Sequence, residues 1–235
     1  NLYEPWLLPL ALATLILGMI GAVAAASLGR MAAYFVIASV GTLLLAFGLG
    51  SSDAIAAGLY YLPHSTFVTA TFFLLIDALA KRRGLHADKL TVAADMPQSW
   101  LWGSLYLALA VLLAGLPPLS GFLGKFLLLK SALDHSWLIP VWVVVLLTAL
   151  LGLIVLARAG SMLFLRGAAE EGQEATVIRH VHHEVWPIAG LLLLTLGLTV
   201  WAGFFNDRAA DAASQLLAPQ RYVAAVLAPE RSVLP

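Results

Sequence analysis

Long apolar runs separated by short polar stretches dominate the pattern of this chain. A helix needs about 20 mostly apolar residues to cross the hydrocarbon core of a bilayer. The strands of a membrane barrel would instead alternate polar and apolar residues, which these runs do not. The pattern therefore predicts an all-α integral membrane protein with about seven transmembrane helices. The seven apolar runs cover residues 5–26, 31–49, 54–79, 98–116, 119–133, 137–156 and 185–205.

The pattern changes after residue 205. Residues 206–235 mix polar and apolar positions, and Pro219 interrupts them. We therefore expect a transmembrane helical domain over residues 1–205 and a polar C-terminal tail over residues 206–235, which begins with a short interfacial or solvated helix. The sequence starts at Asn1 without a Met or the basic segment of a signal peptide. We expect it to be a piece of a longer protein, with a processed N-terminus as the alternative.

The composition agrees with a membrane location and excludes several classes of function. Only 11% of the residues are charged and 61% are hydrophobic, whereas a soluble domain carries about 25% charged residues. The formal net charge of zero argues against nucleic-acid binding, which usually needs a basic surface. The chain has no Cys, so disulfides, thiol catalysis and Cys-ligated metal centres are excluded. Nucleotide-binding glycine motifs and zinc-protease motifs are also missing, so an ATP-driven pump or a nicotinamide site within this chain is unsupported.

The sharpest chemical signal is Lys125, which lies inside the fifth apolar run. A charged Lys at the bilayer centre is unfavourable by at least about 2.5–3.5 kcal/mol. It persists only where it faces a cavity, pairs with another group or sheds its proton. Pro117, Pro118, Gly121 and Gly124 come just before it and predict a helix broken near residues 117–121. Because broken helices at membrane depth line cavities in many transporters, we predict that Lys125 carries a proton. The alternative is a lysine that snorkels to the interface.

A second candidate is His64, which follows Pro63 in the third apolar run. Proline removes one helical hydrogen bond and kinks the segment. Histidine titrates near neutral pH, so it can pass protons in either direction. We predict that His64 relays protons beside Lys125. A histidine that only packs between helices is the alternative.

The remaining charged residues within or beside the apolar runs have weaker signals. Arg30 and Arg158 keep their charge at all physiological pH values, so their predicted role is electrostatic support rather than proton transfer. Ordinary loop charges are the alternative. Asp77 is expected to pair with Lys81, four residues later on the same helix.

A histidine-rich loop near residue 180 offers side chains that could bind a metal. Its members are His180, His182, His183 and Glu184. Their spacing matches no strong ligand motif, and histidines clustered in a loop are usually solvated. We therefore predict no metal site there.

Three of these segments resemble the proton-translocating, antiporter-like subunits that multisubunit Mrp cation/proton antiporters share with respiratory complex I. The most specific of them is the broken-helix segment that ends in Lys125. Together with residues 158–161, it points to the D-type subunits of the Mrp antiporters, which are also called Pha. The matching segments are residues 30–34 with 39–41, residues 63–66 with 70–74, and residues 115–125.

The resemblance covers nearly the whole chain but only the C-terminal half of such a protein. It implies a secondary transporter rather than an enzyme: a multi-pass component of a Na⁺ or K⁺/proton antiporter in the bacterial cytoplasmic (inner) membrane. Other subunits and the missing half would be its partners, and ion gradients would supply the work without a cofactor. The family often has an Asp and a Lys where this chain has Ser27 and Gly29. That departure leaves Arg30 only an electrostatic role.

Two rival interpretations remain open. A proton-pumping subunit of a complex I-type NADH:quinone oxidoreductase would use the same lysine chemistry but would have redox partners. A non-transporting assembly subunit would tolerate replacement of Lys125 and His64 without loss of ion flux. Keeping a buried lysine for packing alone is unfavourable, which weighs against the second rival.

Overall fold

The computed structural model describes residues 4–92, 98–165, 182–218 and 220, and all statements of structure below concern these residues. They form eight α-helices and no β-strand, so the predicted all-α class is confirmed. The helices are α1 (Glu4–Ala24), α2 (Leu28–Leu49), α3 (Ser52–Arg82), α4 (Ser99–Ala114), α5 (Ser120–Ser131), α6 (Leu138–Gly160), α7 (His182–Val200) and α8 (Ala202–Leu216).

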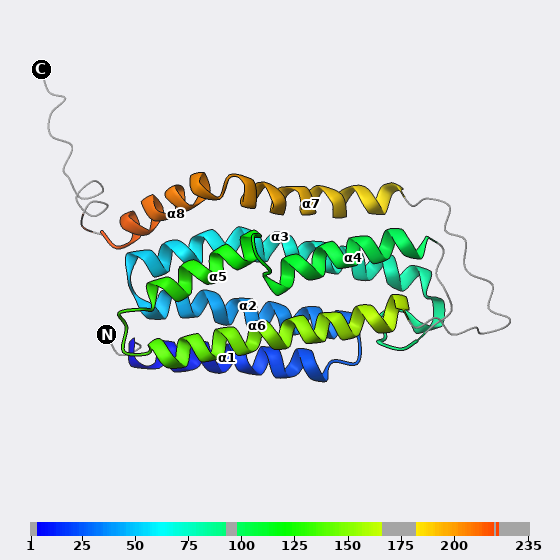
Figure 1. Cartoon of the computed structure of the whole chain (residues 1–235), viewed down its shortest axis with the longest axis horizontal. Coiled ribbons are helices and arrows are strands. Elements are labelled where there is room, and N and C mark those ends of the chain that lie inside the picture. The colour runs from blue at the N-terminus through cyan, green and yellow to red at the C-terminus, as the bar shows by residue number, and fades with distance from the viewer. Residues whose placement is uncertain (1–3, 93–97, 166–181, 219, 221–235) are drawn as a thin grey trace, which may run out of the picture.

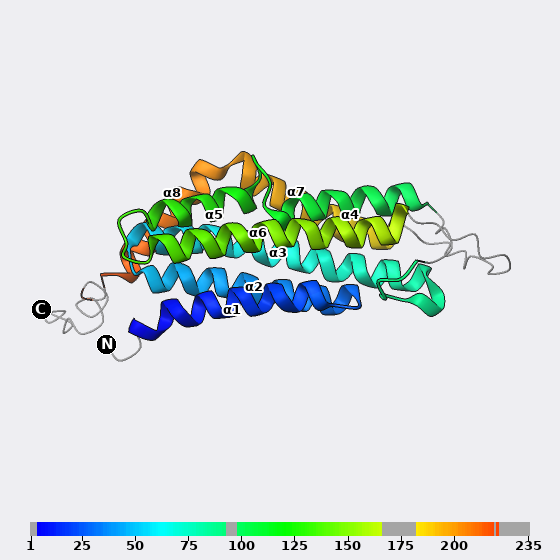
Figure 2. The same ribbon diagram turned by 60° about the horizontal axis from the view of Figure 1, so that its bottom comes forward.

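The helices lie side by side along one long axis (Figures 1 and 2). Among the first three helices, each is antiparallel to the one before it. Helices α4 and α5 lie end to end beside α3, and α7 and α8 follow one another along the same side (Figure 1). Five helices are long and apolar enough to cross a membrane, namely α1, α2, α3, α6 and α7, while α4 is a shorter apolar helix. The chain is thus a multi-pass membrane protein.

The lengths of two helices refine the predicted count of about seven transmembrane helices, one of them broken. The fourth and fifth apolar runs are α4 and α5, which have 16 and 12 residues. A helix of 12 residues is only about 18 Å long, which is too short for a hydrocarbon core of about 30 Å. Because α4 and α5 lie end to end, they form one interrupted span, as the predicted break near residues 117–121 requires. The described chain therefore has five long spans and one broken span.

Short, well-capped turns make the first three helices antiparallel neighbours. The hydroxyl of Ser27 accepts the backbone N–H of Arg30 at the start of α2, and Ser51 accepts that of Ala54 at the start of α3. Serine at this position satisfies a backbone donor that has no partner inside the helix. Helix α2 ends at Gly50, whose φ of 68° is the left-handed conformation that glycine adopts freely.

Small residues let α1 and α2 approach closely. A Cβ atom on Gly18 would lie 2.7 Å from the backbone nitrogen of Ala38, and one on Gly41 would lie 2.7 Å from that of Leu15. Close backbone contact of this kind drives helix association in membranes, where burying apolar side chains brings no advantage over lipid. The outward faces of the bundle carry large apolar side chains, such as Leu150 of α6 at 54% exposed, that suit contact with lipid.

Beyond α3, Arg83 organises the turn that closes one end of the bundle. Its guanidinium donates hydrogen bonds to the carbonyl oxygens of Ala87, Lys89 and Thr91 at 3.0, 2.6 and 2.5 Å. Partial burial lowers the pKa of Arg83, and the nearby charge of Asp88 opposes that change. Arginine remains charged despite such a shift, so this turn is fixed by one cation and three carbonyl groups.

The helix that follows the apolar runs is longer than the expected short interfacial or solvated helix. Helix α7 ends at Val200, and α8 begins at Ala202 and runs across residues 205 and 206. Ala209 and Ala213 of α8 are buried, and Ala213 packs against Ile55 and Ala56 of α3. The helix is therefore longer than the pattern suggested and is packed on the bundle along one face.

Candidate functional site

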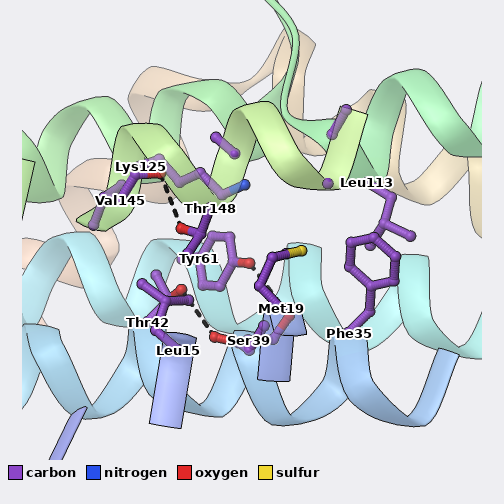
Figure 3. Close-up of a pocket in the computed structure, with 14 residues that line it drawn as sticks. Leu15, Met19, Phe35, Ser39, Thr42, Tyr61, Leu113, Lys125, Val145 and Thr148 are labelled. Atoms are coloured by element: carbon purple, nitrogen blue, oxygen red, sulfur yellow. Dashed lines mark hydrogen bonds between the residues drawn. The ribbon is translucent and has the colours of Figure 1, made fainter. Parts of the chain in front are cut away.

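Lys125 lies beside a small cavity at mid-height of the bundle. The cavity has a volume of about 30 Å³, room for about one water molecule. Figure 3 shows Lys125 and the side chains of Ser39, Tyr61 and Thr148 around it. Ser39 and Thr148 stand near the middle of α2 and α6, two of the membrane-spanning helices. The ammonium group is therefore placed far from both ends of the bundle.

The walls of this cavity offer oxygen atoms but no acid. The hydroxyls of Thr42 and Thr148 donate to backbone carbonyls of their own helices, at 3.1 and 2.7 Å. Their lone pairs remain available as acceptors. The hydroxyls of Ser39 and Tyr61 lie 3.4 Å apart. Among the described residues, Lys125 forms no ion pair, and the polar side chains that line the cavity with it are hydroxyls.

The break between α4 and α5 places Lys125 near the end of a neighbouring helix. Helix α4 ends at Ala114, and Gly115 follows with a φ of 72°. A Cβ atom on Gly115 would lie 3.4 Å from Lys125 Nζ, so the ammonium group reaches the carboxyl end of α4. Pro117 and Pro118 occupy the connection between the two helices, where they interrupt no helical hydrogen bond.

His64 is buried on α3, with only 3% of its surface exposed. Its Nδ1 lies 2.9 Å from the hydroxyl oxygen of Ser120, the first residue of α5. The His64 ring packs near that of Tyr61, with ring centroids 5.6 Å apart. His64 of α3 thus lies beside the start of α5, and Lys125 lies five residues after Ser120 on α5.

Two glycines let α5 lie directly on α3. Gly121 and Gly124 are inside α5 and not in the break itself. A Cβ atom on Gly121 would lie 2.6 Å from His64 Nε2, and one on Gly124 would lie 3.0 Å from the Tyr61 ring. Real Cβ atoms do not approach other atoms as closely as the first of these, so Gly121 makes the room that the imidazole occupies.

The two predicted supporting arginines lie outside this site. Arg30 is exposed in the first turn of α2, and Arg158 is exposed near the end of α6. The guanidinium of Arg158 donates to the carbonyl oxygen of Val23 at 3.0 Å. No described hydrogen bond or ion pair joins either arginine to Lys125 or His64.

A buried ion pair at one end of the bundle was missed from the sequence. The side chain of Arg82 is only 3% exposed, and its Nη1 lies 2.6 Å from Glu184 Oε2 of α7. Its guanidinium also lies 4.0 Å from the centre of the Trp102 ring of α4. The predicted pair of Asp77 and Lys81 is present at 2.5 Å. The sequence places Arg82 after the end of an apolar run, where it looks like a loop residue. Its partner was not recognised because Glu184 is about 100 residues further along the chain.

The histidine-rich loop is only partly described. His180 and the side chain of His182 lie outside the described residues. Within the described part of the chain, no three His, Asp or Glu side chains gather in a way that could hold a metal ion. Glu184, the acid of that segment, is engaged by Arg82 and lies 3.5 Å from Lys81.

Comparison with known proteins adds sequence relatives to this geometry. Residues 1–152 match the family described as NADH:quinone oxidoreductase/Mrp antiporter, TM. The probable K(+)/H(+) antiporter D subunit of Rhizobium meliloti (strain 1021) is 34% identical over 97% of this chain and 47% of the relative. The Na(+)/H(+) antiporter D subunit of Bacillus subtilis (strain 168) is 30% identical over 93% of this chain and 43% of the relative. The chain thus spans about half the length of these relatives.

Solved structures show the same fold. A chain in the structure of the Mrp complex from Dietzia sp. DQ12-45-1b aligns with a TM-score of 0.81 and 24% identity, covering 96% of this chain and 49% of that one. A chain of respiratory complex I from Thermus thermophilus with bound NADH aligns with a TM-score of 0.70 and 29% identity, covering 92% and 45%. The first likeness, at this identity, speaks for the fold alone.

Proposed function

Because the chain belongs to the NADH:quinone oxidoreductase/Mrp antiporter transmembrane family, we propose that it is the C-terminal half of a D-type subunit of an Mrp antiporter. The complete protein would be a secondary transporter component in a bacterial cytoplasmic (inner) membrane. With partner subunits, it would exchange Na⁺ or K⁺ against H⁺. Relatives named for K(+)/H(+) and for Na(+)/H(+) exchange support this class of activity and leave both cations open.

The observation that carries the proposal is the position of Lys125. An amine without an acid partner in the described chain, beside a cavity with room for water at mid-bundle, can exchange its proton with that water. Broken helices whose ends meet at mid-membrane are a recurring feature of transporters. In this proposal Lys125 carries the proton through the middle of the membrane.

His64 would pass that proton on. Its Nε2 faces Gly121, and Gly121 and Lys125 are four residues apart on one face of α5. The break near Pro117 and Pro118 would admit the water that connects the two groups. Arg30 and Arg158 would act only through their charge and from a distance, since neither contacts the site.

The first test is Lys125→Ala in the complete antiporter complex, assayed as cation-driven proton movement in everted vesicles. Exchange should fall at least about 100-fold, the usual effect of removing an essential proton carrier, while the complex still assembles. Lys130→Ala is the matched control, because Lys130 lies on the same helix but is exposed. Normal exchange by an assembled Lys125→Ala complex would mean that the proton follows another route.

A complex I-type proton pump is the second candidate. The matched family includes NADH:quinone oxidoreductase chains, and the Thermus thermophilus chain is 29% identical to this one. Lys125 would have the same role there, but the partners would carry flavin and iron–sulfur centres. Purifying the native complex and measuring its NADH oxidation and its cofactor spectrum separates the two candidates, since an antiporter shows neither.

A non-transporting assembly role makes the opposite prediction for the same variants. If Lys125→Ala and His64→Gln complexes both assemble and exchange ions normally, this half of the protein is structural. The burial of His64 and the lack of an acid partner for Lys125 in the described chain weigh against that outcome.

A further inference from the structure

The hydroxyl group of Ser120 connects three helices. Ser120 is the first residue of α5, its side chain is fully buried, and its hydroxyl oxygen contacts two other helices. One contact is to His64 Nδ1 of α3, at 2.9 Å, and the other is to the backbone carbonyl oxygen of Thr195 of α7, at 3.4 Å. A single hydroxyl therefore stands between an imidazole nitrogen and a carbonyl group.

The hydrogen atoms in this arrangement can be assigned from the chemistry of the groups. A carbonyl oxygen only accepts hydrogen bonds, so the contact with Thr195 uses the one hydroxyl hydrogen of Ser120. Ser120 must then accept from His64, which requires the hydrogen on Nδ1. We infer that Ser120 is a positioning residue that fixes His64 in the Nδ1–H tautomer and leaves Nε2 as its proton acceptor.

The backbone around Ser120 keeps its hydroxyl free for this role. The first N–H groups of a helix have no partner inside it, and serine hydroxyls often satisfy them. Here the N–H of Ser120 instead donates to the hydroxyl of Thr199, at 2.9 Å, so α7 caps α5. The Thr199 hydroxyl also lies 3.5 Å from the Thr195 carbonyl oxygen. Ser120 is thus held at its backbone by Thr199 while its side chain serves His64.

The other ring nitrogen faces the break in the helix. A Cβ atom on Gly121 would lie 2.6 Å from His64 Nε2. It would lie 2.8 Å from the carbonyl oxygen of Leu112, which is near the end of α4. Lys125 lies four residues after Gly121, further along the same face of α5. An unprotonated Nε2 is therefore presented on the side from which a proton from Lys125 would arrive.

The tautomer itself can be measured without any transport assay. The complete complex labelled with ¹⁵N-histidine is compared by solid-state NMR with the same complex carrying His64→Gln, so that the difference spectrum reports His64. At about pH 8.5, two units above the usual histidine value, we expect a protonated Nδ1 and an unprotonated Nε2. A wild-type spectrum with the hydrogen on Nε2 would overturn the inference.

Replacement of Ser120 then tests the cause. In Ser120→Ala, the Nδ1–H signal should decrease and an Nε2–H signal should appear, and exchange should fall about tenfold, as when an outer-shell partner of a histidine is removed. Ser131→Ala is the matched control on the same helix, because the Ser131 hydroxyl donates only to its own helix, to Leu128. That control should change neither the spectrum nor the exchange rate.

The expected effect on exchange rests on the proposed function, and the two can fail separately. If Ser120→Ala leaves the His64 spectrum unchanged, Ser120 does not set the tautomer, whatever the fate of the antiporter proposal. If the tautomer shifts as expected but both Ser120→Ala and His64→Gln exchange ions normally, the inference about Ser120 stands and the relay role of His64 fails.

Discussion

Two regions of the bundle hold a positive charge in different surroundings: Arg82 is buried, whereas Lys125 is partly exposed beside a cavity. At one end, Arg82 lies 2.6 Å from Glu184 and is stacked on Trp102. At mid-height, Lys125 lies beside hydroxyl groups and a small cavity, without an ion pair among the described residues. The charge of Arg82 is held by an acid and an aromatic ring, whereas no described acid holds the charge of Lys125.

The two side chains, arginine at one place and lysine at the other, have properties that match these different surroundings. Arginine stays protonated in proteins and forms rigid, directional pairs, so it suits a permanent link between α3 and α7. Lysine is a point charge on a flexible stem and loses its proton readily when desolvated. The comparison teaches that an acid partner separates a cation held as a structural link, such as Arg82, from one for which proton transfer is proposed, such as Lys125.

The largest expected effect comes from removing half of the buried pair. Arg82→Met removes the close partner of Glu184, which is mostly buried and keeps only the 3.5 Å contact with Lys81, so the folded state should be destabilised by up to about 3–5 kcal/mol. Arg82→Met with Glu184→Met should recover most of that stability and retain ion exchange. Thermal unfolding of the assembled complex in detergent measures both. A single variant as stable as the double variant would mean that the pair is not a structural link.

An intermediate effect is expected where α5 meets α3. Gly121→Ala places a methyl group 2.6 Å from His64 Nε2, so one helix must shift, which should destabilise the bundle by about 1–3 kcal/mol. Ion exchange should fall as well, because the histidine is displaced. Gly190→Ala is the matched control on α7, since a Cβ atom there meets nothing within 4 Å. Equal stability and exchange in the two variants would contradict this account of Gly121.

The smallest effect is expected at the exposed pair beside Arg82. Asp77→Asn removes the 2.5 Å contact with Lys81, whose side chain is half exposed. Exposed ion pairs contribute about 0–1 kcal/mol, so thermal unfolding and ion exchange should both stay close to the wild type. A loss of stability similar to that of Arg82→Met would show that the four charges at this end act as one network.

The sequence predicted the helices well because their signal is local. Each apolar run is mostly helical, although the last one covers parts of both α7 and α8, and the prolines near residue 117 marked the break correctly. The number of spans was only approximate, because apolar content gives the length of a run but not its position relative to another run. Residues 98–116 and 119–133 look like two spans until their end-to-end arrangement is seen (Figure 1).

The roles of Lys125 and His64 remain predictions, but the sequence did single out two residues that the structure places on adjacent helices. Lys125 and His64 stood out because ionisable groups are rare within apolar runs. Arg82 did not, since α3 continues past the expected end at residue 79 and its partner Glu184 comes from a distant part of the chain. The link from His64 to Ser120 could not be found either, because a serine beside two prolines is an ordinary feature of a turn until α3 is placed next to it.

The break between α4 and α5 also has an electrostatic consequence. Backbone dipoles give the carboxyl end of a helix a partial negative charge and the amino end a partial positive one. Lys125 Nζ lies near the carboxyl end of α4, while His64 touches the amino end of α5. Each end contributes about 0.3–1 kcal/mol, so the interrupted span favours a charge on the lysine and disfavours one on the histidine. Under the proposed relay, proton movement from Lys125 to His64 would therefore be the unfavourable step, which an ion gradient would have to drive.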